Sequence, residues 1–526
     1  MSKATIGASV MVASPHALAS AAGARILERG GNAFDAAVAV SACLAVVYPH
    51  MTGVGGDSFW LMYHAGDRAV RAYNGSGRSG YGATLDAFAG EAAIPERGVR
   101  SVVTVPGMVD SWDAVVREYG RMRLGDVLEP AIAYADKGFP VSPDQHKDTR
   151  LRREMLASER LAARIFLPSG AVPAAGARLL QRELAHTLRR IAAGGREAFY
   201  KGDIAGRIAS FLKGRGGLLG ADDFADHSGN WVAPVTGAYR GLELVQLPPN
   251  SQGFAGIMAA HIVENCDFGA IGHGSFEYYH TLIEALKLAF RDRNAMLTDP
   301  DFAAVPVSDL LDKSYCRRLF SQIRMDRALS LTPERLGSDT AYAAVVDREG
   351  NAVSFIQSLY FEFGSGVVAG DTGVLLHNRG SFFSLDPVHV NRLEPRKRTF
   401  HTLMPAMVLR EGKPYLIYGT QGGEGQPQTQ TALLTRIVDY GMDPQTAINE
   451  PRWVWGRTWG DASEGLRLES RIDAAVADRL RQAGHQVQAA GSYDGVVGHA
   501  QAILIDGQGY RIGAADPRSD GSAIGW

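Results

Sequence analysis

The amino-acid sequence predicts an α+β fold, in which helical patterns dominate up to Met296 and strands follow one another after Thr340. Apolar residues recur at helical spacing in several early segments, whereas later segments carry alternating apolar runs typical of strands. The 526 residues include 61 glycines, which favours many tight turns. With 46% hydrophobic and 21% charged residues, the composition is that of a soluble globular protein.

The helical part begins with two helices between residues 16 and 47, which Gly30-Gly31 separates. The second of them is largely apolar, so we expect it to be buried. A glycine-rich loop at 48–57 then leads into a strand at 58–63, and such a loop often lies at a functional site. Further helices are expected at 106–118, 124–135, 183–193, 202–213, 254–265 and 276–296, with a strand at 242–246 and a turn-rich segment at 248–253.

The pattern changes after Met325. Residues from about 326 to 339 are polar and charged with little periodicity, so they are expected to form an exposed linker. Strands follow at 341–346 and 352–359 around a turn at Arg348-Glu-Gly-Asn351, and this arrangement predicts a hairpin. Another strand is expected from Val367 onward, and a strand at 414–419 precedes the glycine loop 420–425.

Bulk properties exclude several classes of function. The net charge is -2, so no strong field draws the chain to nucleic acid or to anionic lipid. The three cysteines form no CxxC pair, and the 14 histidines show no metal-binding spacing, so neither a metal nor another cofactor is expected. No apolar run is long enough to cross a membrane, and the first residues lack the pattern of a secretory signal. We therefore expect a cytoplasmic protein.

The junction between Asp339 and Thr340 is the candidate reactive element. Hydrolysis of an amide needs a strong nucleophile, a base and donors for the oxyanion that forms. A threonine at a new amino terminus carries its own base, since an α-amino group has an unperturbed pKa of about 8. The Thr340 hydroxyl can make the cut itself by attacking the carbonyl of Asp339. The local pattern alone indicates only a structural strand residue, because β-branched side chains favour strands.

Short strings that span nearly the whole chain decide between these interpretations. In chain order they are Ser14-Pro15-His16, Gly30-Gly-Asn-Ala-Phe-Asp-Ala-Ala37, Gly53-Val-Gly-Gly-Asp57, Val105-Pro-Gly107, Pro248-Pro-Asn-Ser-Gln-Gly253, Thr340-Ala-Tyr-Ala-Ala-Val-Val-Asp347 and Asp516-Pro-Arg518. Their identity and order resemble the γ-glutamyltransferase family of amino-terminal-nucleophile hydrolases. The resemblance implies a four-layer αββα sandwich built jointly by two fragments of one precursor, a large subunit at 1–339 and a small subunit at 340–526.

The resemblance also assigns roles to four residues. It implies that Thr340 is the nucleophile and that the backbone of Gly422 and Gly423 supplies the oxyanion hole. Ser358 stands where the family has a hydroxyl that supports the nucleophile. Without the family, Gly422-Gly423 would be a tight turn and Ser358 a solvated strand residue.

The substrate pocket departs from the family pattern. Members that bind a γ-glutamyl group use an arginine in the large subunit, and an asparagine, a glutamine, an aspartate and paired serines in the small one. The arginine position falls on Gly75 or Ser76, with Arg78 close by, and the other positions hold Tyr360, Arg379, Phe382, His401 and Thr402. Loss of the aspartate removes the partner of an α-ammonium, whereas Arg379 adds a fork suited to a carboxylate. The alternatives are a surface ion pair for Arg379 and a satisfied core histidine for His401.

These departures favour a small amide that carries a carboxylate and no amino group. Strings such as Asn378-Arg-Gly380 and Glu362-Phe-Gly-Ser-Gly366 are similar to an oxamate-hydrolysing subgroup of the family. The leading hypothesis is therefore an autoprocessing hydrolase of oxamate-like amides, with the small-molecule amide and the two fragments as partners. The first alternative is a γ-glutamyltransferase or glutathione hydrolase, and the second is a binding protein that is never cleaved. The sequence does not indicate the oligomeric state.

Overall fold

Two antiparallel seven-stranded sheets form the centre of the computed structural model, which describes residues 3–331, 339–456 and 465–526. The first sheet has the order β1 (Thr5–Gly7), β18 (Arg511–Ala515), β17 (Ala500–Ile505), β13 (Lys413–Thr420), β12 (Ala406–Arg410), β9 (Leu242–Gln246) and β8 (Val235–Tyr239). The second has the order β19 (Ser522–Gly525), β2 (Met11–Ser14), β10 (Asp339–Val346), β11 (Ala352–Tyr360), β3 (Asp57–His64), β4 (Ala69–Gly75) and β7 (Asn230–Val232). Both sheets combine strands from before and after Thr340.

Side chains on each strand alternate between two apolar layers, as the two-residue period of a strand requires. In β10, Tyr342 and Ala344 pack between the sheets against residues such as Met407 and Ile417 of β12 and β13. The neighbouring Ala343 faces the helices on the other side. The inner core therefore joins the two sheets face to face.

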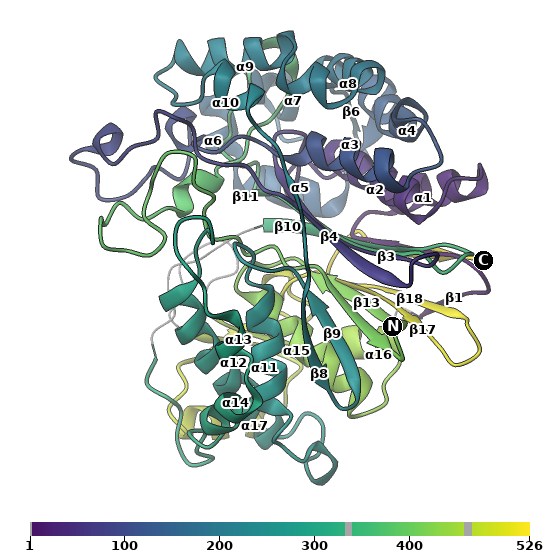
Figure 1. The fold of residues 1–526 in the computed structure, drawn as a ribbon, viewed down its shortest axis with the longest axis vertical. Coiled ribbons are helices and arrows are strands. Elements are labelled where there is room, and N and C mark those ends of the chain that lie inside the picture. Colours follow the sequence, from purple (N-terminus) through teal and green to yellow (C-terminus); the bar gives the residue numbers. More distant parts are fainter. Residues whose placement is uncertain (1–2, 332–338, 457–464) are drawn as a thin grey trace.

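Helices cover the outer face of each sheet, so the layers run helix, sheet, sheet, helix (Figure 1). The second sheet is covered by α1 (Ala17–Glu28), α2 (Ala33–Val47), α3 (Met108–Tyr119), α4 (Leu124–Lys137) and α8 (Arg182–Tyr200). The first sheet is covered by α11 (Gly253–Val263), α12 (Phe276–Met296), α14 (Lys313–Phe320), α15 (Gly425–Val438), α16 (Pro444–Asn449) and α17 (Ala474–Gln482). The α+β class is thus confirmed.

Shorter elements complete the molecule. They are α5 (Pro143–Leu151), α6 (Arg153–Ser158), α7 (Arg160–Phe166), α9 (Asp203–Lys213), α10 (Ala221–Ala225), α13 (Val307–Leu310), a three-stranded sheet of β14 (Trp453–Trp455), β15 (Leu466–Glu469) and β16 (Val487–Ala490), and the pair β5 (Phe139–Pro140) and β6 (Arg178–Leu179). None of the helices within the described ranges has the length and apolar character needed to span a bilayer.

Local signals explain why the helices begin where they do. Asn32 caps α2 through bonds from the backbone of Phe34 and Asp35, and the Asp35 carboxylate accepts from the Asn32 N–H in return. All of α2 is buried, as its apolar sequence predicts. The expected strand from Val367 is wrong, because only an isolated bridge between Val368 and Leu375 forms there. Of the linker expected at 326–339, residues 326, 327 and 330 are exposed and 328, 329 and 331 are partly exposed, whereas 332–338 lie outside the described residues.

Candidate active site

The register of three neighbouring strands places Thr340 beside Ser358. Asp339 pairs with Tyr360, and Ala341 pairs with Gln357, so two residues of β11 face the single residue Thr340. On the other side of β11, Ser358 pairs with Asp57 of β3. Such a bulge redirects side chains and is common next to active sites. Thr340, Ser358 and Asp57 therefore lie at one end of the sheet, and all three are buried.

Ser358 is not the solvated strand residue of the simpler interpretation. Its side chain is 2% exposed, and its hydroxyl oxygen accepts a hydrogen bond of 2.7 Å from the N–H of Tyr360. Tyr360 has a φ of +83°, a value that non-glycine residues rarely adopt. Strained backbone of this kind tends to gather at functional sites.

The loop Gly422–Glu424, hereafter the oxyanion loop, lies at the beginning of α15. Gly422 and Gly423 have φ values of +116° and +48°, and their carbonyl oxygens accept bonds from Gly425 and Gln426. Within the described part of the chain, the N–H groups of both glycines donate to no acceptor. The positive end of the α15 dipole adds to the stabilisation of negative charge at this point.

Gln426 connects α15 to the candidate nucleophile. Its Nε2 lies 3.5 Å from Oγ1 of Thr340, and its Oε1 accepts a bond of 3.2 Å from the N–H of Met404. The structure therefore brings Thr340, Ser358 and the oxyanion loop together, as the sequence analysis expected. Their catalytic roles remain predictions. A contact between Gln426 and Thr340 was not expected, although Gln426 stands directly after the glycine loop 420–425.

Arg379 is a buried cation next to this site. Its side chain is 2% exposed, its guanidinium carbon lies 4.1 Å from the centre of the Tyr360 ring, and Nη1 and Nη2 have no hydrogen-bond partner among the described residues. Burial lowers the pKa of Arg379 to about 10, against the opposing influence of Tyr360 and Asp57. The alternative of a surface ion pair is therefore wrong. Phe382 packs edge-on against Tyr360, with ring centres 5.6 Å apart.

Asp57 forms an unexpected buried centre with two histidines. Its Oδ1 accepts from Gly77 and Gly107, whereas its Oδ2 lies 3.3 Å from Nε2 of His401 and 3.4 Å from Nδ1 of His377. Burial by itself raises the pKa of Asp57, but the two imidazoles outweigh it and hold the pKa far below its usual range. The signal available in the sequence was the glycine loop that ends at Asp57.

His401 remains neutral in this centre. Burial, and next the charge of Arg379, lower its pKa to about 3. Its Nδ1 accepts a long bond of 3.4 Å from the N–H of Leu403, so Nε2 carries the proton that faces Asp57. The geometry matches the alternative of a satisfied core histidine. Thr402 is buried beside it, and its carbonyl oxygen accepts a bond of 2.7 Å from Gln252.

Arg78 is engaged away from the site. Its Nη1 lies 3.0 Å from Asp299, and its Nη2 lies 2.6 Å from Asp301. Nη1 also donates to the carbonyl oxygen of Arg396. These partners occupy the guanidinium, so the expected role in substrate binding gains no support from the geometry.

A cavity of about 630 Å³ lies at the other end of the sandwich. It is lined by residues such as Tyr63, Arg410 and Arg511, which lie at strand ends, and Glu349, which lies in the turn after β10. Its position separates it from the chemistry-bearing groups, so it is not the candidate active site.

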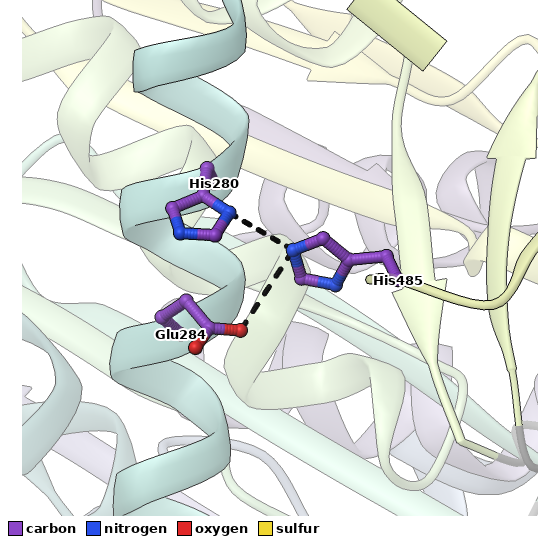
Figure 2. Close-up of side chains that lie close together, drawn as sticks. All are labelled: His280, Glu284 and His485. Carbon is purple, nitrogen blue, oxygen red and sulfur yellow. Dashed lines mark hydrogen bonds and ion pairs between the residues drawn. The ribbon is translucent and has the colours of Figure 1, made fainter. Parts of the chain in front are cut away.

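One group of side chains has the composition of a metal site. His280 and Glu284 of α12 meet His485, with 2.9 Å between Nδ1 of His280 and Nε2 of His485 (Figure 2). However, Lys287 lies 2.8 Å from the Glu284 carboxylate, and Nε2 of His280 donates to the carbonyl of Arg324. The lysine charge opposes a cation, and the atoms already satisfy one another. The group is better described as a buried polar network that joins α12 to the segment after α17.

Comparison with known proteins agrees with the fold and the site. Residues 19–526 match the family model described as Gamma-glutamyltranspeptidase. The chain is 61% identical over 525 residues to the Glutathione hydrolase-like YwrD proenzyme of Bacillus subtilis, with 100% of both chains covered. It is 39% identical over 521 residues to the Oxamate amidohydrolase proenzyme of Klebsiella pneumoniae, with 98% of both covered.

A solved structure shows the same architecture. The crystal structure of cephalosporin acylase from Bacillus halodurans superposes with a TM-score of 0.93 at 36% sequence identity, covering 100% of this chain and 97% of that one. These relatives are proenzymes or acylases, which sets aside the alternative of a binding protein that is never cleaved. The chain therefore belongs to the gamma-glutamyltranspeptidase family of amino-terminal-nucleophile hydrolases and is an amidohydrolase proenzyme that gives rise to two fragments.

Proposed function

We propose that the chain cuts itself before Thr340 and that Thr340 then hydrolyses an amide whose acyl group carries a carboxylate held by Arg379. The observation that carries this proposal is the buried guanidinium of Arg379, whose two terminal nitrogens have no partner among the described residues. A buried cation left in this state is unfavourable, and a carboxylate in the site would satisfy it with two parallel hydrogen bonds.

The chemistry needs only groups of this chain. The free α-amino group of Thr340 takes the proton from its own hydroxyl, and Oγ1 attacks the amide carbon. The N–H groups of Gly422 and Gly423 stabilise the oxyanion, and the amine leaves with the transferred proton. An ester on Thr340 remains, and a water molecule, deprotonated by the same amino group, hydrolyses it to release the acid.

An oxamate-like substrate fits the charges around Arg379. The Asp57 carboxylate accepts two backbone N–H groups and faces two imidazoles, so it is already engaged rather than placed to receive a substrate ammonium. Tyr360 and Phe382 add bulk beside Arg379. A small amide with a carboxylate and no amino group therefore satisfies the site without leaving a charge unpaired.

A second candidate is the hydrolysis of glutathione or another γ-glutamyl compound. The relative with 61% identity is named glutathione hydrolase-like, whereas the oxamate amidohydrolase is 39% identical, so similarity gives this candidate the stronger support. A γ-glutamyl group also carries an α-carboxylate that Arg379 can hold. Its α-ammonium is the group for which the described site offers no evident partner.

The test compares both substrates with one preparation of the processed protein. Ammonia release from oxamate and anilide release from a γ-glutamyl anilide are measured for the unaltered chain and for Arg379→Ala. Turnover of oxamate that depends on Arg379 supports the first candidate. Turnover of the anilide alone rejects the first candidate function in favour of the second. Turnover of either substrate that is the same in Arg379→Ala as in the unaltered chain rejects the proposed carboxylate site.

A further inference from the structure

The oxyanion loop is held from outside by side chains that the proposed mechanism does not use. We infer that Gln252 and Arg293 are positioning residues that fix the oxyanion loop in its catalytic conformation, through the carbonyl of Gly423 and the side chain of Glu424. This inference rests on the proposed function. Gln252 and Arg293 belong to the large-subunit segment and Glu424 to the small one, so the proposed catalytic conformation depends on both fragments.

Gln252 makes the direct contact with the loop. Its side-chain Nε2 donates to the carbonyl oxygen of Gly423 at 3.2 Å and to that of Thr402 at 2.7 Å. Its backbone N–H donates to the carbonyl of His401 at 3.0 Å. The side chain is fully buried. The side chain and the backbone of Gln252 together therefore connect the oxyanion loop to residues 401–402 beside Asp57.

Arg293 orients Gln252 and holds Glu424 at the same time. Its Nη1 donates to Oε1 of Gln252 at 2.6 Å, and its Nη2 lies 3.0 and 2.9 Å from the two oxygens of Glu424. The guanidinium is fully buried and stacks over Phe290, 4.1 Å from the ring centre. Charge-assisted bonds of this kind are stronger and geometrically more restrictive than neutral ones.

The glycines make this external support necessary. Gly423 lies in the left-handed region, where glycine is free to change conformation at little energetic cost. Holding its carbonyl from one side and the next residue, Glu424, from the other restricts the peptide planes that carry the N–H donors. An oxyanion donor that tilts away lowers the rate, because removal of one donor costs about 100- to 1000-fold in kcat.

A matched pair of variants separates this role from general support of the fold. Gln252→Ala removes the bonds to the oxyanion loop. Gln246→Ala removes an equally buried glutamine of β9, whose amide donates to Gln430 at 2.9 Å and does not touch the loop. The kcat and KM of both variants are measured with oxamate and with a γ-glutamyl anilide, together with their thermal midpoints.

We expect Gln252→Ala to lower kcat by about 10- to 100-fold with KM changed less than about threefold, because only the transition state uses the oxyanion donors. Gln246→Ala should lose thermal stability by a similar amount and keep its kcat. A kcat within about twofold of the unaltered chain in Gln252→Ala overturns the inference. An equal loss of kcat in both variants overturns it as well.

A second pair tests the ion pair on the same helix. Arg293→Met removes the ion pair with Glu424, and Lys287→Met removes the ion pair with Glu284 at a position six residues earlier in α12. Only the first change should lower kcat selectively. The combination of Arg293→Met with Gln252→Ala should lose less than the product of the two single effects, since both act on one loop.

Two further controls keep the outcome decisive. If Gln252→Ala does not accumulate as folded protein, Gln252→Glu keeps an oxygen that accepts from Arg293 and puts an acceptor oxygen in place of the amide that donates to Gly423 and Thr402, and the same outcomes apply. Thr340→Ala is assayed in parallel. Residual turnover in Thr340→Ala rejects the proposed function itself, whereas an inactive Thr340→Ala beside an unimpaired Gln252→Ala rejects only the positioning role.

Discussion

The guanidinium of Arg379 stacks on the ring of Tyr360, with 4.1 Å between the guanidinium carbon and the ring centre. Stacking fixes the plane of the fork and leaves the outer nitrogens, Nη1 and Nη2, without a protein partner among the described residues. Tyr360 is itself held in an unusual backbone conformation at the end of β11, where its N–H donates to Ser358. Arg379 and the candidate nucleophile Thr340 therefore both lie beside the same end of β11.

The position of the Arg379 guanidinium predicts the effect of its removal. Arg379→Ala should still be cleaved before Thr340, because the hydroxyl and the scissile carbonyl are unchanged. Its KM for a carboxylate-bearing amide should rise about 10- to 100-fold, since a hydrogen bond to a charged group is worth about 1.5–3 kcal/mol. Arg379→Lys should be intermediate, because an ammonium keeps the charge and loses the fork.

Arg78→Ala is the control for this prediction. Arg78 is a partly buried arginine near Arg398, and its guanidinium is paired with Asp299 and Asp301. Its loss should lower the thermal midpoint and leave KM unchanged. Steady-state kinetics of both variants with the same substrate show which arginine determines KM. An unchanged KM in Arg379→Ala would mean that the carboxylate is held elsewhere.

Substitution of the candidate nucleophile should separate processing from turnover. Thr340→Ala removes the hydroxyl and should remain one chain of 56.4 kDa without activity. Thr340→Ser keeps a hydroxyl and should be cut slowly, because the serine lacks the methyl group that fixes the threonine rotamer. Intact mass spectrometry over time measures both, and fragments that meet between residues 339 and 340 in Thr340→Ala would disprove the assignment.

The sequence predicted those parts of the molecule that depend on local pattern. The helices α1, α2 and α12 were found within a few residues of their ends, because their apolar periodicity and their stop signals are continuous in the chain. The hairpin of β10 and β11 was predicted from its turn, and its register is what brings Thr340 beside Ser358. The strand expected from Val367 failed because its glycine-rich neighbours favour turns over a continued ladder.

The supports of the site could not be predicted, because their partners are distant in the chain. Gln252 and Gly423 are 171 residues apart, and Arg293 and Glu424 are 131 apart. Arg293 lies in a helix where an arginine is usually solvated, so its burial could not be read from periodicity. The only signals were that Gln252 stands inside a string that resembles the family and that Glu424 stands inside the glycine loop 420–425.

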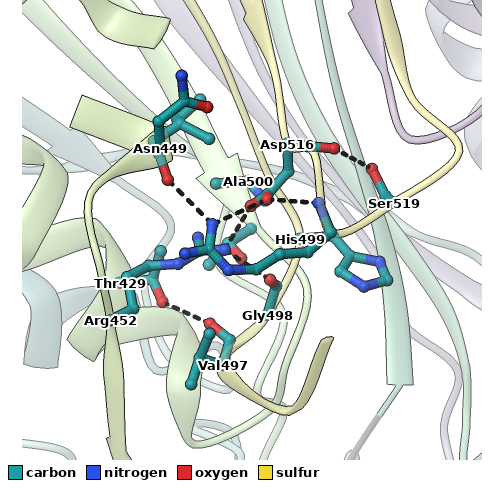
Figure 3. Close-up of polar contacts among 12 residues, drawn as sticks. Thr429, Asn449, Arg452, Val497, Gly498, His499, Ala500, Asp516 and Ser519 are labelled. Atoms are coloured by element: carbon teal, nitrogen blue, oxygen red, sulfur yellow. Dashed lines mark hydrogen bonds and ion pairs between the residues drawn. The ribbon is translucent and has the colours of Figure 1, made fainter. Parts of the chain in front are cut away.

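Gly498 lies against the residue that precedes the oxyanion loop. A Cβ atom on Gly498 would lie 2.6 Å from the carbonyl oxygen of Gln421, the residue before Gly422, and its φ is +90°. The carbonyl of Gly498 is in turn held by Arg452 at 2.8 Å, and Arg452 also pairs with Asp516 (Figure 3). We expect Gly498→Ala to displace Gln421 and to lower kcat at least about 10-fold, since small displacements of catalytic groups reduce rates strongly.

Gly412→Ala is the matched control for Gly498→Ala. Gly412 also has a positive φ, of +74°, but a Cβ atom there would meet nothing within 4 Å. Both variants carry a backbone penalty, of about 1–2 kcal/mol in the left-handed region and about 1–3 kcal/mol at Gly498, whose ψ of 167° lies in a region essentially confined to glycine. Only Gly498→Ala should lose activity, so equal kcat values in the two variants would show that the contact with Gln421 is tolerated.

The neutral state of His401 predicts a dependence of stability on acid. Its pKa is about 3 in the folded chain, lowered by burial and next by Arg379, against about 6.5 in an unfolded chain. The unfolded state therefore binds the proton more readily, so the stabilisation is complete above pH 6.5 and is lost as the pH falls toward 3. The expected loss is about 1.4 kcal/mol per pH unit from this one group.

Urea unfolding at pH 7 and pH 5 measures this loss of stability. The Thr340→Ala precursor is used so that a single chain unfolds. His401→Asn should lose less stability between pH 7 and pH 5 than its parent. His186→Asn, a change at an exposed position, should lose as much stability as the parent. If His401→Asn and its parent lose stability equally between the two pH values, the imidazole of His401 does not take up a proton on unfolding as the buried site requires.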